Sequence, residues 1–187
     1  MPDYPSTPSL WNESNASALY IADGVTGIGS HAFSGMDTLE KVVFQDASDL
    51  TYVAATPLTA TTRPNLRTRG IQNEKTTLNL SSVTRMGENA FYNCDGIKGV
   101  ELSGSITAVE TKEEGGTEDI NNKIPNHALK AVALTSITVP EGIKIIGTAA
   151  FAGCTQASSI TLPNSLVTIG TERLCAALMA TTNSLPP

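Results

Sequence analysis

The sequence is poor in the residue types on which several common protein functions depend. Its 12 Lys and Arg residues are outnumbered by 18 Asp and Glu residues, which gives a formal net charge of -6. That acidic balance argues against nucleic acid and anionic lipid as partners, because both attract basic surfaces. No apolar run approaches the roughly 18 to 20 residues that a membrane helix requires. The first 30 residues also lack the basic start and apolar block of an export signal. We therefore expect neither nucleic-acid binding nor direct membrane insertion.

Reactive motifs are scarce as well. Histidine occurs twice and cysteine three times in the 187 residues. The sequence has no Ser-His-acid set, no phosphate-binding loop and no dinucleotide fingerprint. It has neither the EF-hand spacing nor the glycine-aspartate nonapeptide of calcium-binding proteins. We therefore expect no enzyme active site, no metal site and no cofactor.

What the sequence does contain is a repeat. The phrase GVTGIGSHAF at residues 24–33 returns as SVTRMGENAF at 82–91 and as GIKIIGTAAF at 142–151. Each copy keeps its apolar residues at the same steps, as in Val83, Met86 and Phe91 or Ile143, Ile146 and Phe151. Later copies follow at a period of 22 to 23 residues, from Leu129 to Phe151 to Leu174. A chain that is 40% hydrophobic can bury a sizeable core, and this period is typical of a solenoid whose units cannot bury their apolar face alone.

Local patterns assign three parts to each unit. Residues 39–44, 97–102, 135–140 and 158–163 alternate apolar and polar side chains and predict short strands that stack in parallel. Residues 143–147 and 166–170 predict a second extended segment that ends in glycine. Residues 30–36, 88–94 and 148–154 are expected to form a helical turn that packs its phenylalanine into the core.

The repeat resembles that of the BspA-like (Treponema-type) leucine-rich-repeat family, L-x-x-I-x-L-P-x-x-V-x-x-I-G-x-x-A-F-x-x-C. The closest matches are ITVPEGIKIIGTAAFAGC at 137–154 and ASSITLPNSLVTIGTERLC at 157–175, and the resemblance covers roughly residues 19–178. It implies a right-handed superhelix of short parallel strands with short helical turns. Departures are Leu129 in place of Phe, Val132 in place of Cys, and a last copy at 171–179 that is expected to form a helical cap.

The resemblance also implies a function. Members of this family are mostly surface or secreted bacterial proteins that bind host or neighbouring-cell proteins through the repeat surface. It therefore implies a non-enzymatic protein-binding or adhesion module, secreted or at the cell surface, with an extracellular or cell-surface protein as partner. A structural domain that assembles with copies of itself is the alternative, because open solenoid ends invite pairing. The oligomeric state stays open.

The domain organisation follows from the repeat. We expect an N-terminal flank at 1–18, the repeat domain at 19–178 and a tail at 179–187, with insertions near 45–77 and 110–124. Residues 45–77 hide a degenerate copy or form one long excursion, and the sequence does not decide between these. They carry Arg63, Arg67, Arg69 and Lys75, which form a solvated face or a docking patch for an acidic partner. The polar, glycine-rich stretch 110–124 predicts a solvated surface loop with acidic residues Glu110, Glu113, Glu114, Glu118 and Asp119.

The cysteines are expected to be thiols that fill core space. Cys94 and Cys154 occupy the same slot, three residues after a phenylalanine. Two units apart, their positions would be separated by roughly 10 Å, whereas a disulfide needs α-carbons within about 7 Å. Cys175 lies in a different slot, and its approach to Cys154 stays open.

The histidines also share one slot. His31 and His127 each lie two residues before the core residue of the turn, where other copies have Asn89 and Ala149. Two or three units would place them about 10 to 15 Å apart, too far to bind one metal ion together. We expect a polar position at the start of the turn.

The best candidate site is a surface rather than a pocket. Side chains between the buried positions of each strand would align from unit to unit and form a shared face. Thr138 and Thr161 would also suit strands by propensity alone, and this alternative stays open. The residues of the predicted face are Glu40, Lys41, Val43, Lys98, Glu101, Thr135, Ser136, Thr138, Ser158, Ser159 and Thr161.

Overall fold

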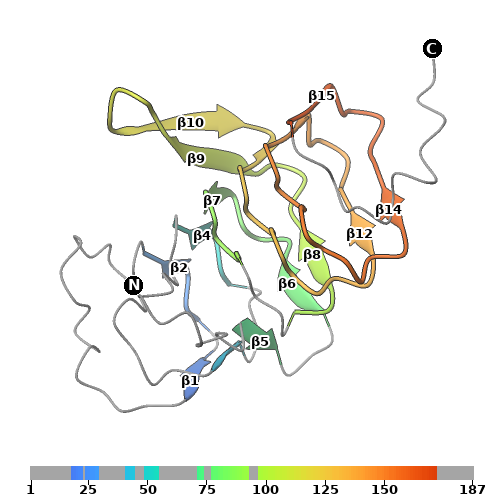
Figure 1. The fold of residues 1–187 in the computed structure, drawn as a ribbon. Coiled ribbons are helices and arrows are strands. Elements are labelled where there is room, and N and C mark those ends of the chain that lie inside the picture. The colour runs from blue at the N-terminus through green and yellow to red at the C-terminus, as the bar shows by residue number, and fades with distance from the viewer. Residues whose placement is uncertain are drawn as a thin grey trace.

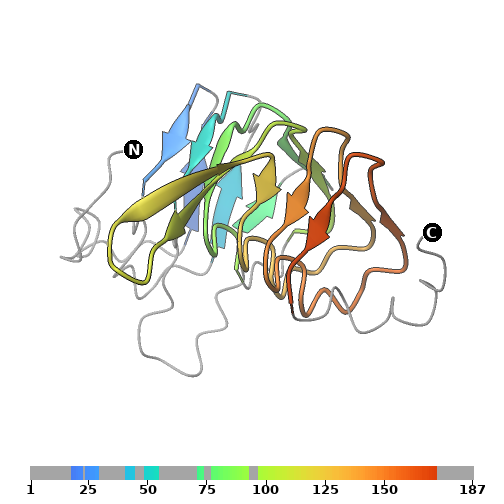
Figure 2. The same cartoon turned by 90° about the horizontal axis from the view of Figure 1, so that it is seen from above.

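The fold is a solenoid of short parallel strands. The computed structural model describes residues 18–22, 24–29, 41–44, 49–54, 71–73, 77–92 and 97–171. These residues form strands β1 to β15 and no helix. The chain winds so that successive strands stack beside one another, as the colour progression in Figures 1 and 2 shows. None of the described segments is a helix long and apolar enough to span a membrane.

The first column of the solenoid contains the second extended segment of each coil, which includes the two predicted segments that end in glycine, at 143–147 and 166–170. Strands β2 (Gly27–Ile28), β4 (Tyr52–Val53), β7 (Arg85–Gly87) and β9 (Thr107–Thr111) pair in parallel in that order. Strands β11 (Lys123–Ile124), β13 (Ile145–Ile146) and β15 (Thr168–Ile169) continue in parallel. The Lys123 N–H donates to the Ile106 carbonyl at 3.0 Å and joins the two groups.

The second column contains three strands that alternation predicts, β8 (Val100–Leu102), β12 (Ile137–Thr138) and β14 (Ile160–Thr161), and one that was not predicted, β6 (Leu78–Leu80). Strand β6 pairs in parallel with β8, and β12 pairs in parallel with β14. The Thr135 N–H donates to the Lys98 carbonyl at 3.0 Å and connects these pairs. Strands β1 (Ala18–Ile21), β3 (Lys41–Phe44) and β5 (Ile71–Asn73) form a separate parallel sheet.

The stretch 45–77, for which the sequence left two alternatives, contributes strands to the stack. Strand β4 lies between β2 and β7, and β5 pairs with β3. Tyr52 is the register partner of Gly27 on one side and of Arg85 on the other. Among its described residues, this stretch therefore takes part in the repeating architecture.

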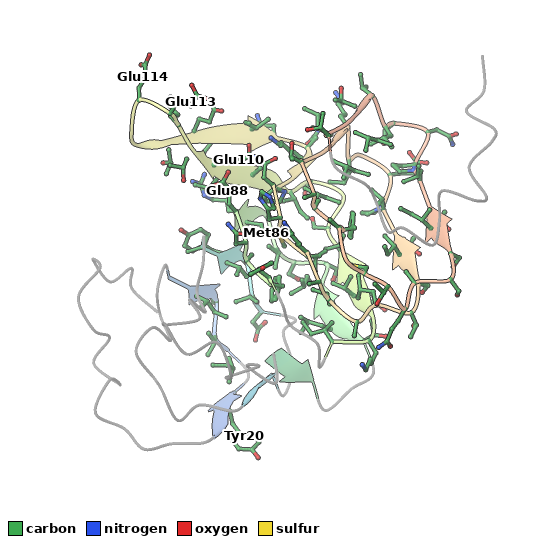
Figure 3. The ribbon with its side chains drawn as sticks, viewed as in Figure 1. Tyr20, Met86, Glu88, Glu110, Glu113 and Glu114 are labelled. Atoms are coloured by element: carbon green, nitrogen blue, oxygen red, sulfur yellow. The ribbon has the colours of Figure 1, made fainter. Side chains whose placement is uncertain are left out.

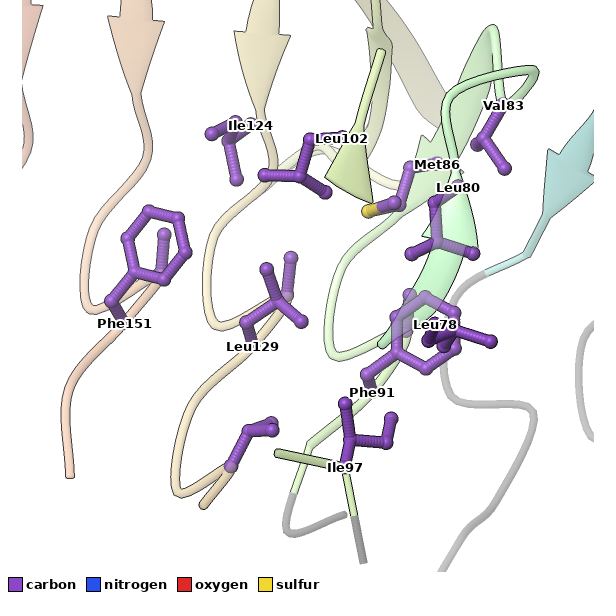
Figure 4. Packing of buried hydrophobic residues seen from close by; sticks show 14 of the residues in the cluster. Leu78, Leu80, Val83, Met86, Phe91, Ile97, Leu102, Ile124, Leu129 and Phe151 are labelled. Atoms are coloured by element: carbon purple, nitrogen blue, oxygen red, sulfur yellow. The ribbon is translucent and has the colours of Figure 1, made fainter. Parts of the chain in front are cut away.

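The core explains why the period exists. Six successive coils each place one apolar residue at the same level of the first column, and these six are buried: Ile28, Val53, Met86, Ala108, Ile124 and Ile146. Ile169, at the same level on the last described strand, is exposed. Phe91, Leu129 and Phe151 follow at the next turn, each 0% exposed, and point into the same interior (Figure 4). Complete burial of such a side chain contributes about 1.5 to 3 kcal/mol. The substitution of Leu for Phe at residue 129 keeps the position apolar and buried.

The turns that the structure describes, at 88–92 and 148–154, differ from the prediction, since they are not helical. The predicted turn at 30–36 and nearly all of the predicted cap at 171–179 lie outside the described residues. Asn89, His127 and Ala149 occupy the same slot, and all three have positive φ angles of 57°, 56° and 53°. The backbone N–H groups of the next residues alternate between acceptors in the next coil and acceptors in their own coil. The Leu129 N–H donates to the Ala150 carbonyl of the next coil at 2.9 Å, whereas the Lys130 N–H donates to the His127 carbonyl at 3.2 Å. A helix would direct all of these donors within its own coil. Stacking therefore replaces the expected helical turn with a chain of tight turns.

The predicted surface loop at 110–124 is also wrong in one respect, because it is ordered as a hairpin. Strand β9 pairs in antiparallel fashion with β10 (Thr117–Asn121). The hairpin extends away from the stack, with Glu113 and Glu114 at its tip (Figure 3). Its residues are mostly exposed, but Glu110 is buried rather than solvated.

Candidate binding surface

The predicted face is exposed wherever the structure describes its side chains. The backbone of Lys41 and Val43 lies on β3, with side chains outside the described part, and Glu40 lies outside the described residues. The eight remaining side chains are all exposed: Lys98, Glu101, Thr135, Ser136, Thr138, Ser158, Ser159 and Thr161. They belong to β8, β12, β14 and the residues immediately before these strands.

Parallel pairing brings the members of this surface together. Thr138 on β12 is the register partner of Thr161 on β14, although 23 residues separate them in sequence. Glu101 on β8 is the register partner of Asn79 on β6. The surface therefore changes along the solenoid axis from charged residues at β8 to Ser and Thr at β12 and β14. We call the exposed residues Lys98, Glu101, Ser136, Thr138, Ser159 and Thr161 the strand face.

Thr135 and Ser158 are left out of the strand face because their hydroxyls have a structural role. The Thr135 hydroxyl donates to the Lys98 carbonyl at 3.2 Å, and the Ser158 hydroxyl donates to the Thr135 carbonyl at 3.2 Å. The first column has the same kind of hydrogen bond between coils, since the Thr51 hydroxyl donates to the Thr26 carbonyl at 2.9 Å. The prediction missed this role. The signal for it was a Ser or Thr two residues before the strand in successive copies of the second column.

A buried polar cluster lies at the base of the hairpin. The Lys123 ammonium contacts the Glu110 carboxylate at 2.5 Å, and the Asn126 N–H donates to the same carboxylate at 3.0 Å. The Asn126 side chain donates to Glu88 at 3.3 Å and accepts the Thr148 N–H at 2.8 Å. This cluster, which the repeat pattern does not predict, fastens the hairpin to the coils on both sides of it. No group of His, Cys, Asp or Glu suited to a metal ion occurs within the described residues.

A second ion pair joins the outer strand of the hairpin, β10, to strand β7 of the stack. Arg85 on β7 contacts the Asp119 carboxylate on β10 through two nitrogens, at 2.5 and 3.1 Å. The hydrogen bond to Asp119 raises the pKa of Arg85 above its already high value, against the smaller opposing effect of desolvation. Both side chains are about half exposed, so this pair is more accessible to salt than the buried one.

Glu141 connects two successive turns of the second column. Its carboxylate accepts the N–H of Asn164 at 2.9 Å and the N–H of Ser165 at 3.3 Å. The bond from Asn164 is the main reason that the pKa of Glu141 lies below its usual value. Glu141 is an exposed residue, so its carboxylate stabilises a surface turn rather than the core.

The remaining candidates have structural explanations where they can be placed. Cys154 is a buried thiol that donates to the Leu129 carbonyl at 3.2 Å, as expected for a residue that fills core space. His127 occupies the left-handed position of its turn. Outside the described residues lie Cys94, Cys175, His31, Arg63, Arg67, Arg69 and Lys75.

Comparison with solved structures gives two similar chains, both of low identity. One is a leucine rich cell surface protein from Faecalibacterium prausnitzii, with 22% identity and a TM-score of 0.42, covering 86% of this chain and 40% of that one. The other is a leucine-rich repeat protein from Bacteroides ovatus, with 18% identity and a TM-score of 0.36, covering 87% of this chain and 59% of that one. This chain thus spans less than two thirds of either protein. None of the curated proteins compared with the chain matches it.

Comparison with protein families gives a match over most of the sequence. The BspA type leucine rich repeat region matches in six copies, over residues 8–59, 69–113 and 122–184. The matched ranges leave out residues 114–121, which include part of the hairpin tip and all of β10. The repeat pattern, the stacked parallel strands and this match together show that the chain belongs to the BspA-type leucine-rich-repeat family.

Proposed function

We propose that this chain is a non-enzymatic protein-binding module that holds its partner on the strand face. The observation that carries the proposal is the register of β12 and β14, which places exposed side chains from separate repeats beside one another. Neighbouring coils are joined by backbone hydrogen bonds, so the face is held in place before a partner arrives. A preorganised surface loses less conformational entropy on binding than a flexible one.

The chemistry of the face favours a protein over a small molecule. Hydroxyl groups on β12 and β14 offer both donors and acceptors, and Lys98 and Glu101 add charges of both signs at the neighbouring strand. Such a mixed, extended surface suits the polar contacts of a protein partner. Family membership supports a location at the cell surface or in secretion, with an extracellular protein as partner.

The test compares capture by the intact chain and by charge-matched variants. The chain is immobilised and exposed to extracellular-matrix and cell-surface protein preparations, and the captured proteins are identified and quantified. The double variant Thr138→Glu/Thr161→Glu adds two negative charges to the strand face. The control Thr168→Glu/Thr171→Glu adds the same charge at exposed positions on and beside β15 in the first column. We expect a protein that is retained by the original chain and by the control but lost from the strand-face variant. Equal retention by all three, or no retained protein, would contradict the proposal.

Self-assembly is the second candidate, and one observation favours it. Val167 and Ile169, on and beside the last described strand, are 78% and 40% exposed. An apolar strand at the end of a stack suits end-to-end pairing with another copy. Light-scattering molar mass over a range of concentrations tests this, since assembly predicts an oligomer that Val167→Lys disrupts, whereas a monomer at all concentrations would contradict it.

A further inference from the structure

Strand β10 has an open edge on the exposed hairpin. It pairs with β9 on one side, and no described strand pairs with its other side. The Lys112 N–H donates to the Gly116 carbonyl at 3.1 Å, so these two residues form a hydrogen-bonded pair. This pair determines which of the following residue pairs between β9 and β10 are hydrogen-bonded and which are not. In antiparallel pairs, every second residue directs both backbone groups to its partner and the intervening residues direct theirs outward. Counting from Gly116, the backbone groups of Thr117 and Asp119 therefore point to the open side.

Two ion pairs hold the hairpin against the stack, so the open edge of β10 has a defined position. At the base, the buried contact between Lys123 and Glu110 joins the start of β11 to β9. Further out, Arg85 on β7 contacts Asp119 across β9. These contacts reduce the ordering that a partner would have to impose on binding.

The charges around the edge select the kind of partner. Glu113, Glu114 and Glu118 are exposed on the hairpin, against a single exposed cation, Lys112. A second copy of the chain would bring like charges together across the new strand pair, which is destabilising. The net charge of -6 adds to that repulsion. A strand with basic side chains would instead meet opposite charges.

We infer that the open edge of β10 is a docking site for an extended, lysine- or arginine-rich segment of another protein, which adds a strand to the hairpin. Backbone hydrogen bonds to Thr117 and Asp119 supply the common part of the interaction, and the glutamates supply the preference for basic side chains. This edge is distinct from the strand face, so the failure of either proposal leaves the other standing.

The test titrates the intact, isotope-labelled chain with a ten-residue peptide in which lysine alternates with threonine and valine. Binding is followed by calorimetry and by the amide resonances of the hairpin. The key variant is Thr117→Pro, which removes an outward N–H but no donor to β9. Its matched control is Thr117→Val, which loses the same hydroxyl and keeps the N–H. We expect Thr117→Pro to weaken binding of the lysine peptide at least about fivefold, because one backbone hydrogen bond is lost. Thr117→Val keeps that bond and should change the affinity by no more than about twofold.

A second peptide keeps the test decisive if Thr117→Pro disturbs the hairpin. It carries the same lysines but has methyl groups on its backbone nitrogens, so it keeps the charge and loses the donors. The inference requires that this peptide does not bind the original chain and that a glutamate version does not bind either. Equal binding of the methylated peptide would reduce the interaction to charge and overturn the inference. Absence of binding by the lysine peptide, or a dimer of the chain that Thr117→Pro abolishes, would also overturn it.

Discussion

The backbone of Asn126 lies directly against Gly147, on the next coil of the solenoid. A β-carbon added at Gly147 would lie 2.6 Å from the Asn126 amide nitrogen and 2.7 Å from the carbonyl carbon of Pro125. Real β-carbons essentially never approach backbone atoms so closely, so this position is restricted to glycine by the spacing of the coils. Gly170, one repeat later, meets the Thr148 nitrogen at 2.5 Å in the same way. The glycine of the repeat is therefore set by stacking between coils.

Gly147→Ala is expected to destabilise the protein by about 1 to 3 kcal/mol, because the coils must move apart to accept the methyl group. Denaturant unfolding followed by circular dichroism measures the loss. Gly27→Ala is the control, since a β-carbon there would make ordinary contacts of 3.6 Å with Tyr52. Equal effects of the two substitutions would be inconsistent with the close approach at Asn126.

Phe151→Ala or Phe91→Ala is expected to cost about 3 to 5 kcal/mol, since each truncation leaves a cavity between coils. Both phenylalanines are completely buried. Val167→Ala, at a position that is 78% exposed, should change the unfolding midpoint little. Unchanged midpoints for the phenylalanine variants would refute their place in the core.

Glu110→Gln should be strongly destabilising, by about 3 to 5 kcal/mol, because it leaves the Lys123 ammonium buried without its counter-charge. The double variant Glu110→Met/Lys123→Met removes both charges and should recover much of the loss. A double-mutant cycle of Glu110→Met, Lys123→Met and the double variant, measured by denaturant unfolding, gives the coupling. The exposed Glu113→Gln serves as the control, and losses for the double variant that equal the sum of the single ones would show that the pair is not coupled.

Glu141 predicts a pH dependence with a definite sign. Its pKa is lowered in the folded protein, so the ionised carboxylate stabilises the fold at neutral pH. That contribution is complete above the unfolded-state pKa of Glu, about 4.3, and is lost as the pH falls through the lower folded-state value. The difference in melting temperature between the original chain and Glu141→Gln should therefore be constant near neutral pH and shrink in acid. A difference that persists unchanged in acid would exclude this role for the carboxylate.

Much of the fold could be predicted from the sequence because stacking requires repetition. Once coils rest on one another, positions such as Met86 and Ile146 must all be apolar, and this requirement appears directly as spacing. Strands β12 and β14 were predicted for the same reason. Exposure of Thr138 and Thr161 followed from alternation, although Thr135 and Ser158 proved to bond to backbone carbonyls.

The features that the sequence did not reveal depend on contacts between distant segments. Ala149 and Ala150 favour a helix by propensity. Instead, the Ala149 N–H donates to the Thr171 carbonyl of the next coil at 3.2 Å, and Ala149 itself has a left-handed backbone conformation. The pairing of Glu110 with Lys123 depends on the register of the hairpin, and polar residues alone gave no sign of that register. Polar composition consequently predicted a solvated loop where the chain forms an anchored hairpin.

The stacked register can be measured directly from the nuclear Overhauser contacts of Thr138 in solution. We expect contacts between Thr138 and Thr161, and between Ile137 and Ile160, in a parallel register. These are the same pairs that place side chains of separate repeats together on the strand face. Contacts of Thr138 with an antiparallel strand, or with sequence neighbours alone, would contradict both the stacked solenoid and the surface built on it.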